Sequence, residues 1–136
     1  MVYALDTNII IHYLRNEPNV RYNFRNAVTG NHDIIIPQIV DYEMRRGFRI
    51  LTAPRKEANY KILLQDCAIA EMDLQSWVYA AQVYEDLYRK SFSVGELDIL
   101  IGAFCLVNRY TLVTNNADDF KNMNGIKLVD WTKPHP

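Results

Sequence analysis

Three acidic residues stand in apolar surroundings and could together hold a metal ion. Asp6 follows a short apolar run, Glu43 comes after three consecutive isoleucines, and Asp98 immediately precedes a further apolar stretch. A carboxylate is costly to bury without a partner, because its charge loses the water around it. Since no basic residue is repeated beside each acid, the expected partner is a hard divalent cation, which binds oxygen ligands.

Each of these acids also has a simpler interpretation. An aspartate at the position of Asp6 could cap a helix by accepting hydrogen bonds from its first backbone N–H groups. Asp98 could cap the following helix in the same way, and Glu43 could be an ordinary exposed helix residue. Three further acids are interpreted as solvated surface residues: Glu96, Asp118 and Asp119.

Short β-branched runs alternate with longer helical patterns along the chain. Five runs are predicted as strands: Val2–Leu5, Asp33–Ile36, Cys67–Ala70, Thr111–Val113 and Lys127–Val129. Five segments are predicted as helices: Tyr22–Val28, Ile39–Leu51, Glu57–Leu64, Leu74–Tyr88 and Leu97–Asn108. This alternation favours an α/β fold whose sheet is mostly parallel and covered by helices on both faces.

The composition predicts one globular domain. The chain has 136 residues, of which 49% are hydrophobic, and we expect a domain over residues 1–132 with a short tail over residues 133–136. Its net charge of −1 excludes a globally basic nucleic-acid-binding protein, so any such affinity requires a local patch. With two distant cysteines and no run of the roughly 18 apolar residues that a membrane span needs, we expect a cytoplasmic protein that does not enter membranes.

The expected fold also predicts where the site lies. In open α/β sheets, ligands bind beyond the carboxyl ends of the strands. Asp6 lies at such an end, and residues 114–119 follow another predicted strand. Glu43 and Asp98 fall near the beginnings of predicted helices, from which their side chains could reach the same edge. One cleft is therefore expected to hold all three acids.

Four short motifs occur in a characteristic order. They are Leu5-Asp6-Thr7-Asn8, Glu43-Met44-Arg45-Arg46-Gly47, Gly95-Glu96-Leu97-Asp98 before Ile101-Gly102-Ala103, and Leu112-Val113-Thr114-Asn115-Asn116 with Asp119-Phe120. Together they resemble the signature of PIN domains, most closely that of the VapC ribonucleases, the toxins of bacterial type II toxin–antitoxin pairs. The resemblance extends over nearly the whole chain. It implies a Rossmann-like three-layer α/β/α sandwich and endonucleolytic cleavage of RNA that depends on Mg²⁺ or Mn²⁺.

The resemblance assigns roles to residues of the matching motifs. Asp6 and Asp98 would be direct metal ligands, while Glu43 would complete the site and order or deprotonate the attacking water. Asn116 occupies the position of a fourth acid in many relatives, so one tightly held metal ion is favoured over two. Hydrogen bonds that orient the ligands would come from Thr7, Asn8 and Thr114.

The chemistry is coherent without the family name. A phosphodiester is anionic and repels hydroxide, and a divalent ion both neutralises that charge and generates a nucleophile. A locally basic stretch after Glu43, including Arg45, Arg46 and Arg49, is a candidate for binding the RNA backbone, with a solvated helix face as the alternative. The resemblance further implies tRNA as the favoured substrate, a VapB-like antitoxin as partner, and a homodimer.

Two other functions remain open at this point. A phosphohydrolase with an acid pocket would need a second acid two residues after Asp6, where this chain has Asn8. A non-catalytic module that binds RNA or protein could use the same fold. Such a module would have little use for three carboxylates that repel one another.

Overall fold

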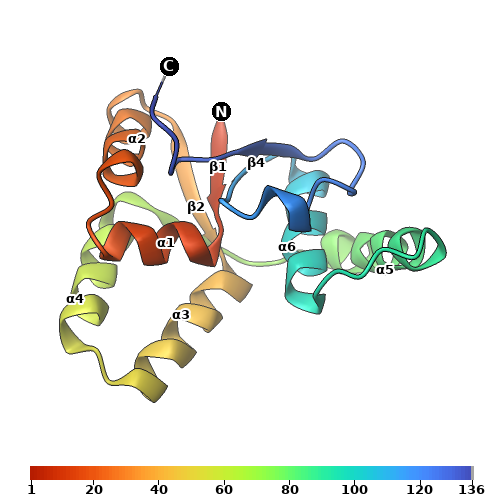
Figure 1. Ribbon diagram of the computed structural model, residues 1–136, viewed down its shortest axis with the longest axis horizontal. Coiled ribbons are helices and arrows are strands. Elements are labelled where there is room, and N and C mark those ends of the chain that lie inside the picture. The colour runs from red at the N-terminus through yellow and green to blue at the C-terminus, as the bar shows by residue number, and fades with distance from the viewer. Residues whose placement is uncertain (136) are drawn as a thin grey trace.

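Within residues 1–135, which the computed structural model describes, five parallel strands form one sheet and six α-helices flank it (Figure 1). The strands are β1 (Val2–Leu5), β2 (Asp33–Pro37), β3 (Ala68–Ala70), β4 (Thr111–Val113) and β5 (Lys127–Val129). The helices are α1 (Thr7–Leu14), α2 (Pro18–Thr29), α3 (Gln38–Leu51), α4 (Pro54–Leu63), α5 (Leu74–Arg89) and α6 (Glu96–Asn108).

The strand order β3-β2-β1-β4-β5 brings the ends of β1 and β4 together. From β1 the chain proceeds outward to β2 and β3, and then returns to the other side of β1 for β4 and β5. A crevice is expected at this change of direction, outside the carboxyl ends of the strands. Here the backbone amide of Asp6 donates to the carbonyl of Val113 at 3.0 Å.

Helices cover the sheet on two sides, as the alternating sequence pattern predicts. Figure 1 shows α1, α2 and α4 on one side of the molecule and α5 and α6 on the other. Right-handed connections between parallel strands account for this division. Because both faces are covered, the central strands are apolar along their length, and Ala4, Leu5, Ile36, Leu112 and Val113 are all buried. This confirms the three-layer α/β/α architecture.

The five predicted strands are all present, and β2 and β3 differ from the prediction by one residue at one end. Two predicted helices begin too late, since α2 starts at Pro18 and α4 at Pro54. Proline suits the first turn of a helix, because the N–H that it lacks would have no partner there. At α2, the side chain of Glu17 completes the start by accepting a hydrogen bond from the amide of Val20 at 2.9 Å.

Helix α1 lies outside the predicted helical ranges. Its run of three isoleucines has a higher preference for strand than for helix, so its pattern does not indicate a helix. Ile9 and Ile10 are nevertheless buried on one side of α1, while Ile11 is partly exposed. Asp6 is the N-cap of this helix, and its side chain accepts a hydrogen bond from the amide of Thr7. The capping interpretation of Asp6 is therefore correct.

The C-terminal segment returns to the body of the fold. In α2, the side-chain amide of Asn23 donates to the carbonyls of Trp131 and Lys133, both at 3.1 Å. The predicted tail thus begins with a residue that contacts α2, and its last residue, Pro136, lies outside the described residues. None of the helices in residues 1–135 combines the length and the apolar character needed to cross a membrane.

Candidate active site

Asp6 is the centre of a hydrogen-bond network at the carboxyl edge of the sheet. Its side chain is only 5% exposed. One oxygen, Oδ1, accepts from the amide of Thr7 at 2.8 Å. The other, Oδ2, accepts from the hydroxyl of Thr114 at 2.8 Å and from the side-chain amide of Asn8 at 3.1 Å. These neutral donors fix the orientation of the carboxylate without supplying a positive charge.

Glu43 reaches the same network from α3. The hydroxyl of Thr7 donates to Oε1 of Glu43 at 2.9 Å. Thr7 therefore connects two acids, because its backbone amide binds Asp6 while its hydroxyl binds Glu43. The half-buried Glu43 lies more than one turn inside α3 rather than near its beginning, and the next residue, Met44, anchors this part of the helix in the core.

Asp98 completes the group from the first turn of α6. It does not cap that helix, since the N-cap residue is Gly95. Burial, the largest cause, and the negative charges of Asp6, Asp119 and Glu43 together raise the pKa of Asp98 to about 6. Apart from burial, each of these causes is another acid. The four carboxylates therefore lie within range of one another's electric fields.

Asp119 is the acid whose role sequence reasoning missed. It is exposed, as predicted for a surface acid, on the short 3-10 helix Ala117–Asp119. Its charge nevertheless contributes to the raised pKa of Asp6, after the larger effect of burial. Asn116 is also exposed, and its backbone amide donates to the hydroxyl of Thr114 at 3.0 Å. The sequence signal for Asp119 is its place in the segment that follows β4.

No basic side chain neutralises these four acids in the described part of the chain. The ion pairs found there join Arg45 to Asp41, Arg89 to Glu85, Lys90 to Asp86, and Lys121 to Asp118. An all-oxygen set of uncompensated carboxylates suits a hard divalent cation in its chemistry. As the side chains stand in residues 1–135, no three of His, Cys, Asp or Glu converge on one ion position. The arrangement fits an ion that is held by one or two carboxylates and keeps several waters, as Mg²⁺ does.

Without metal, Asp98 is expected to lower the stability of the fold as pH rises. Its pKa is about 6 in the folded chain, against an ordinary value of 3.8. The stabilisation that its proton provides is therefore fully present below the ordinary value and is lost as pH rises through the folded pKa. Asp98→Asn should remove this loss, so that the variant melts above wild type near neutral pH and together with it in acid. Melting temperatures measured in EDTA across this range check the prediction, and identical pH profiles would contradict it.

Helix α1 holds the segment after β4 at two points that are one helical turn apart. Oδ1 of Asn8 accepts a hydrogen bond from the backbone amide of Asn115 at 3.2 Å. Nε2 of His12 lies 3.0 Å from the side-chain nitrogen of Asn115. The segment that these contacts hold carries Asn116 and also Asp119, whose charge raises the pKa of Asp6 and of Asp98. His12, which sequence analysis did not assign to the site, therefore belongs to its support.

Replacing His12 by alanine is expected to loosen the segment that follows β4 and to slow metal-dependent activity by about tenfold. This is the lower end of the loss that follows when residues that orient metal ligands are replaced. His12→Gln should recover much of the rate, because its amide can again bond to Asn115. Apparent Mn²⁺ affinity, measured beside the rate, should weaken in His12→Ala and return in His12→Gln. If both variants lose rate equally, His12 serves only as packing.

Of the three arginines predicted to form a basic patch, the exposed Arg45 is paired with an acid of its own helix. Nε of Arg45 donates to Asp41 at 2.7 Å, and the hydroxyl of Tyr60 donates to the same buried carboxylate at 2.7 Å. This triplet joins α3 to α4 and engages one of the three predicted arginines. Arg46 and Arg49 are exposed on α3, and the guanidinium of Arg46 lies over the ring of Tyr42.

The model of the family described as "PIN domain" matches residues 3–126. Ribonuclease VapC2 of Rickettsia felis is 30% identical over 136 residues, which cover 98% of this chain and 100% of that protein. The tRNA(fMet)-specific endonuclease VapC of Salmonella typhimurium is 28% identical, with 95% of this chain and 97% of that protein covered.

Solved structures agree with these sequence matches. A chain of VapBC2 from Rickettsia felis, crystallised on a DNA fragment from its promoter, superposes with a TM-score of 0.89 at 26% identity. The match covers 96% of this chain and 99% of that chain. A chain of DNA-bound VapBC from Salmonella typhimurium gives a TM-score of 0.86 at 26% identity over 96% of this chain and 98% of that chain.

Proposed function

Because the chain belongs to the PIN-domain family and has VapC ribonucleases among its relatives, we propose that it is a metal-dependent endoribonuclease acting as the toxin of a type II toxin–antitoxin pair. One observation carries this proposal: Asp6, Glu43 and Asp98 come from three separate elements and lie within range of one another's electric fields without a neutralising cation. Such a cluster raises the free energy of the metal-free protein and is useful where a cation binds.

Each residue has a defined part in this proposal. Asp6 and Asp98 would hold Mg²⁺ or Mn²⁺, which when bound neutralises phosphate charge and activates water. Glu43, held at 2.9 Å by the hydroxyl of Thr7, would orient that water and accept its proton. Asn8 and Thr114 keep the carboxylate of Asp6 in one orientation, and the side chain of Asn116 would supply a neutral oxygen at the rim.

The exposed arginines of α3 are placed to bind the RNA backbone. Tyr42, Arg46 and Arg49 line a groove of about 510 Å³ on the helix that also carries Glu43. We expect Arg46→Glu with Arg49→Glu to weaken RNA binding and flatten its salt dependence, because fewer counterions are released. Lys127→Glu, a charge reversal at an exposed residue in β5, is the matched control. An unchanged salt slope in the double variant would remove this groove from the account.

The proposed substrate and partner follow the same relatives. We favour tRNA, in line with the tRNA(fMet)-specific endonuclease named above, and a VapB-like antitoxin, in line with the VapBC structures. A groove of about 360 Å³ beside the acids offers a seat for an antitoxin segment. Its lining includes Glu43, the basic residues Arg15 and Lys56, and the apolar side chains of Ile11, Met44 and Phe48. A largely apolar peptide suits this lining.

Cleavage mapping tests the proposal. The chain is incubated with total tRNA in Mg²⁺, in Mn²⁺ or in EDTA, and the new RNA ends are sequenced. Internal cuts at defined positions that need the metal are expected. Binding without cutting would instead identify a binding module, and phosphate release from small phosphomonoesters without internal cuts would identify a phosphohydrolase. Equal cutting in EDTA would contradict metal dependence.

A further inference from the structure

Tyr42 presents an aromatic ring to solvent on the same helix as Glu43. It is 56% exposed, although the buried residues Val40 and Met44 anchor this part of α3 in the core. A tyrosine ring is large and mostly apolar, and it provides a contact surface for another flat group that packs on it. The proposed chemistry at the acids gives this ring no part. What binds the ring is therefore decided by the groups around it.

Two arginines of α3 stand beside the ring. The guanidinium of Arg46 lies over one face of Tyr42, with its carbon 5.2 Å from the ring centroid. Within residues 1–135, the ion pairs engage neither Arg46 nor Arg49. Both arginines line the groove of about 510 Å³ together with Tyr42. Proteins bind single-stranded nucleic acid with these same two elements, an aromatic face for a base and cations for the phosphates beside it.

The groove is continuous with the candidate active site along the surface of α3. Residues three or four positions apart are neighbours on the surface of a helix. Arg46 follows Tyr42 by four residues and Glu43 by three, so it lies between the aromatic ring and the acid. A polymer that is held by Tyr42 and Arg46 is therefore also close to Glu43. This continuity favours the RNA that is to be cut, rather than an unrelated acidic protein, as the occupant of the groove.

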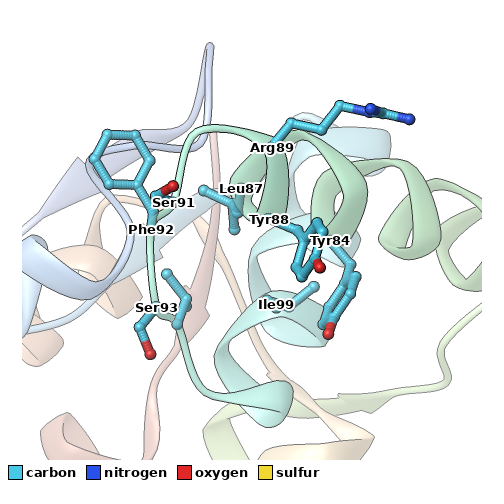
Figure 2. A pocket seen from close by; sticks show the side chains of 9 residues that line it. Tyr84, Leu87, Tyr88, Arg89, Ser91, Phe92, Ser93 and Ile99 are labelled. Carbon is cyan, nitrogen blue, oxygen red and sulfur yellow. The ribbon is translucent and has the colours of Figure 1, made fainter.

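A second exposed aromatic pair, on α5, has its arginine placed differently. The rings of Tyr84 and Tyr88 are stacked with their centroids 6.3 Å apart and line a cavity of about 780 Å³. Figure 2 shows the two tyrosines side by side, with Arg89 pointing away from the other labelled side chains. Arg89 also pairs with Glu85 at 3.0 Å. A base on these rings would have Arg89 turned away from its phosphate, so α3 is the better platform for a nucleotide.

We propose that an unpaired base of the RNA stacks on the face of Tyr42 opposite Arg46, while Arg46 and Arg49 bind the adjacent phosphates. This base subsite rests on the proposed function and narrows its substrate to RNA that is unpaired at the bound position, such as a loop. In a duplex the bases stack on one another, and their faces are not accessible to a side chain. Tyr42 thereby makes the protein prefer loops, whereas the arginines bind any RNA backbone.

Binding measured without cleavage tests the base subsite. The probes are a hairpin RNA with adenines in its loop and a blunt duplex of the same stem; their fluorescence anisotropy is recorded in EDTA, with the RNA checked on a gel. Tyr42→Leu should weaken hairpin binding about tenfold, as expected for the loss of one base–aromatic stack, and leave duplex binding unchanged. Tyr42→Phe keeps the ring and should bind as wild type. Tyr22→Leu, at an α2 tyrosine that is 57% exposed, is the matched control and should also bind as wild type.

Salt dependence and changes in the RNA separate stacking from charge. Tyr42→Leu should keep the wild-type salt slope, because it removes no cation, in contrast to the charge reversal of Arg46 and Arg49. When loop adenines are replaced one at a time by 2-aminopurine, the fluorescence of at least one position should be quenched by wild type and by Tyr42→Phe but not by Tyr42→Leu. An abasic site at that position should weaken binding to wild type about tenfold and leave binding to Tyr42→Leu nearly unchanged, because the two changes remove the same contact.

The base subsite would be overturned if wild type did not bind the hairpin, if Tyr42→Leu weakened binding no more than Tyr22→Leu, or if it weakened hairpin and duplex binding equally. A larger loss in Tyr84→Leu than in Tyr42→Leu would place the base on α5 instead. Displacement of the hairpin by polyglutamate at equal charge concentration would identify an acidic protein as the occupant. Failure of the proposed function is seen separately: a wild type that binds the hairpin through Tyr42 but cuts no RNA in Mn²⁺ would keep the subsite without the activity.

Discussion

Asp6→Asn is expected to reduce metal-dependent RNA cleavage by well over about 100-fold, since replacing residues that merely orient metal ligands already costs up to that factor. Asparagine preserves the shape of the side chain and an oxygen that can accept from Thr7 or Thr114. The substitution removes the negative charge of the carboxylate, and no other group supplies a charge at this position. The fold should survive, because the buried carboxylate is itself costly and its pKa is raised by burial.

The control for this variant is Asp33→Asn, an exposed acid at the first residue of β2 and hence at the amino edge of the sheet. This variant should cleave at the wild-type rate, with initial rates measured in Mn²⁺ on one RNA. The melting temperature of Asp6→Asn without metal should equal or exceed that of wild type. Full cleavage by a folded Asp6→Asn protein would remove Asp6 from the site.

Gly102→Ala is expected to destabilise the fold by about 1–3 kcal/mol, the usual cost of overpacking a core. A Cβ at Gly102 would overlap Sδ of Met123 and would also contact the ring of Phe120. Glycine at this position lets α6 lie directly against the segment that follows β4. The same close approach brings Asp98, one turn earlier in α6, toward the carboxyl edge of the sheet.

Gly47→Ala provides the matched comparison for Gly102→Ala. Gly47 also lies inside a helix, but no atom lies within 4 Å of a Cβ built there. Gly47→Ala should therefore leave the stability of the fold unchanged or raise it by up to about 1 kcal/mol through helix propensity. Denaturant unfolding measures the stability of both variants, Gly102→Ala and Gly47→Ala. In a Met123→Ala background, Gly102→Ala should destabilise the fold less, because the added methyl group no longer overlaps the side chain of residue 123. An unchanged loss of stability would show that overlap with Met123 is not the cause.

The strands and the order of the layers could be predicted because each depends on a local pattern. The apolar runs of β1 and β2 are short, that of β2 consists of β-branched isoleucines, and helical patterns alternate with such runs along the chain, which favours a mostly parallel sheet. Helix α1 could not be predicted in this way, since its isoleucines favour strand locally and only burial of Ile9 and Ile10 under the tertiary fold makes it a helix. Tertiary packing overrides propensity here.

The site shows the same division between local and tertiary information. Asp6 could be found from sequence because it follows a buried strand, and the structure shows that it caps α1 and that its charge raises the pKa of Asp98. The electrostatic effect of Asp119 on Asp98 could not be found in this way, because Asp119 is an exposed acid on a short 3-10 helix and acts on Asp98 only through space. Arg45 belongs to a basic stretch in the sequence, yet the unpredicted buried acid Asp41 engages it.

Measuring Mn²⁺ occupancy and RNA cleavage on the same samples tests the central claim most directly. Bound Mn²⁺ is followed by electron paramagnetic resonance while the single-turnover cleavage rate of one tRNA is recorded across a metal titration. If Asp6, Glu43 and Asp98 hold the ion that cuts RNA, occupancy and rate should rise with one midpoint in wild type. Both curves should then move together to higher Mn²⁺ in Asp98→Asn. A cleavage rate that reaches its maximum while these acids hold no metal would contradict the account.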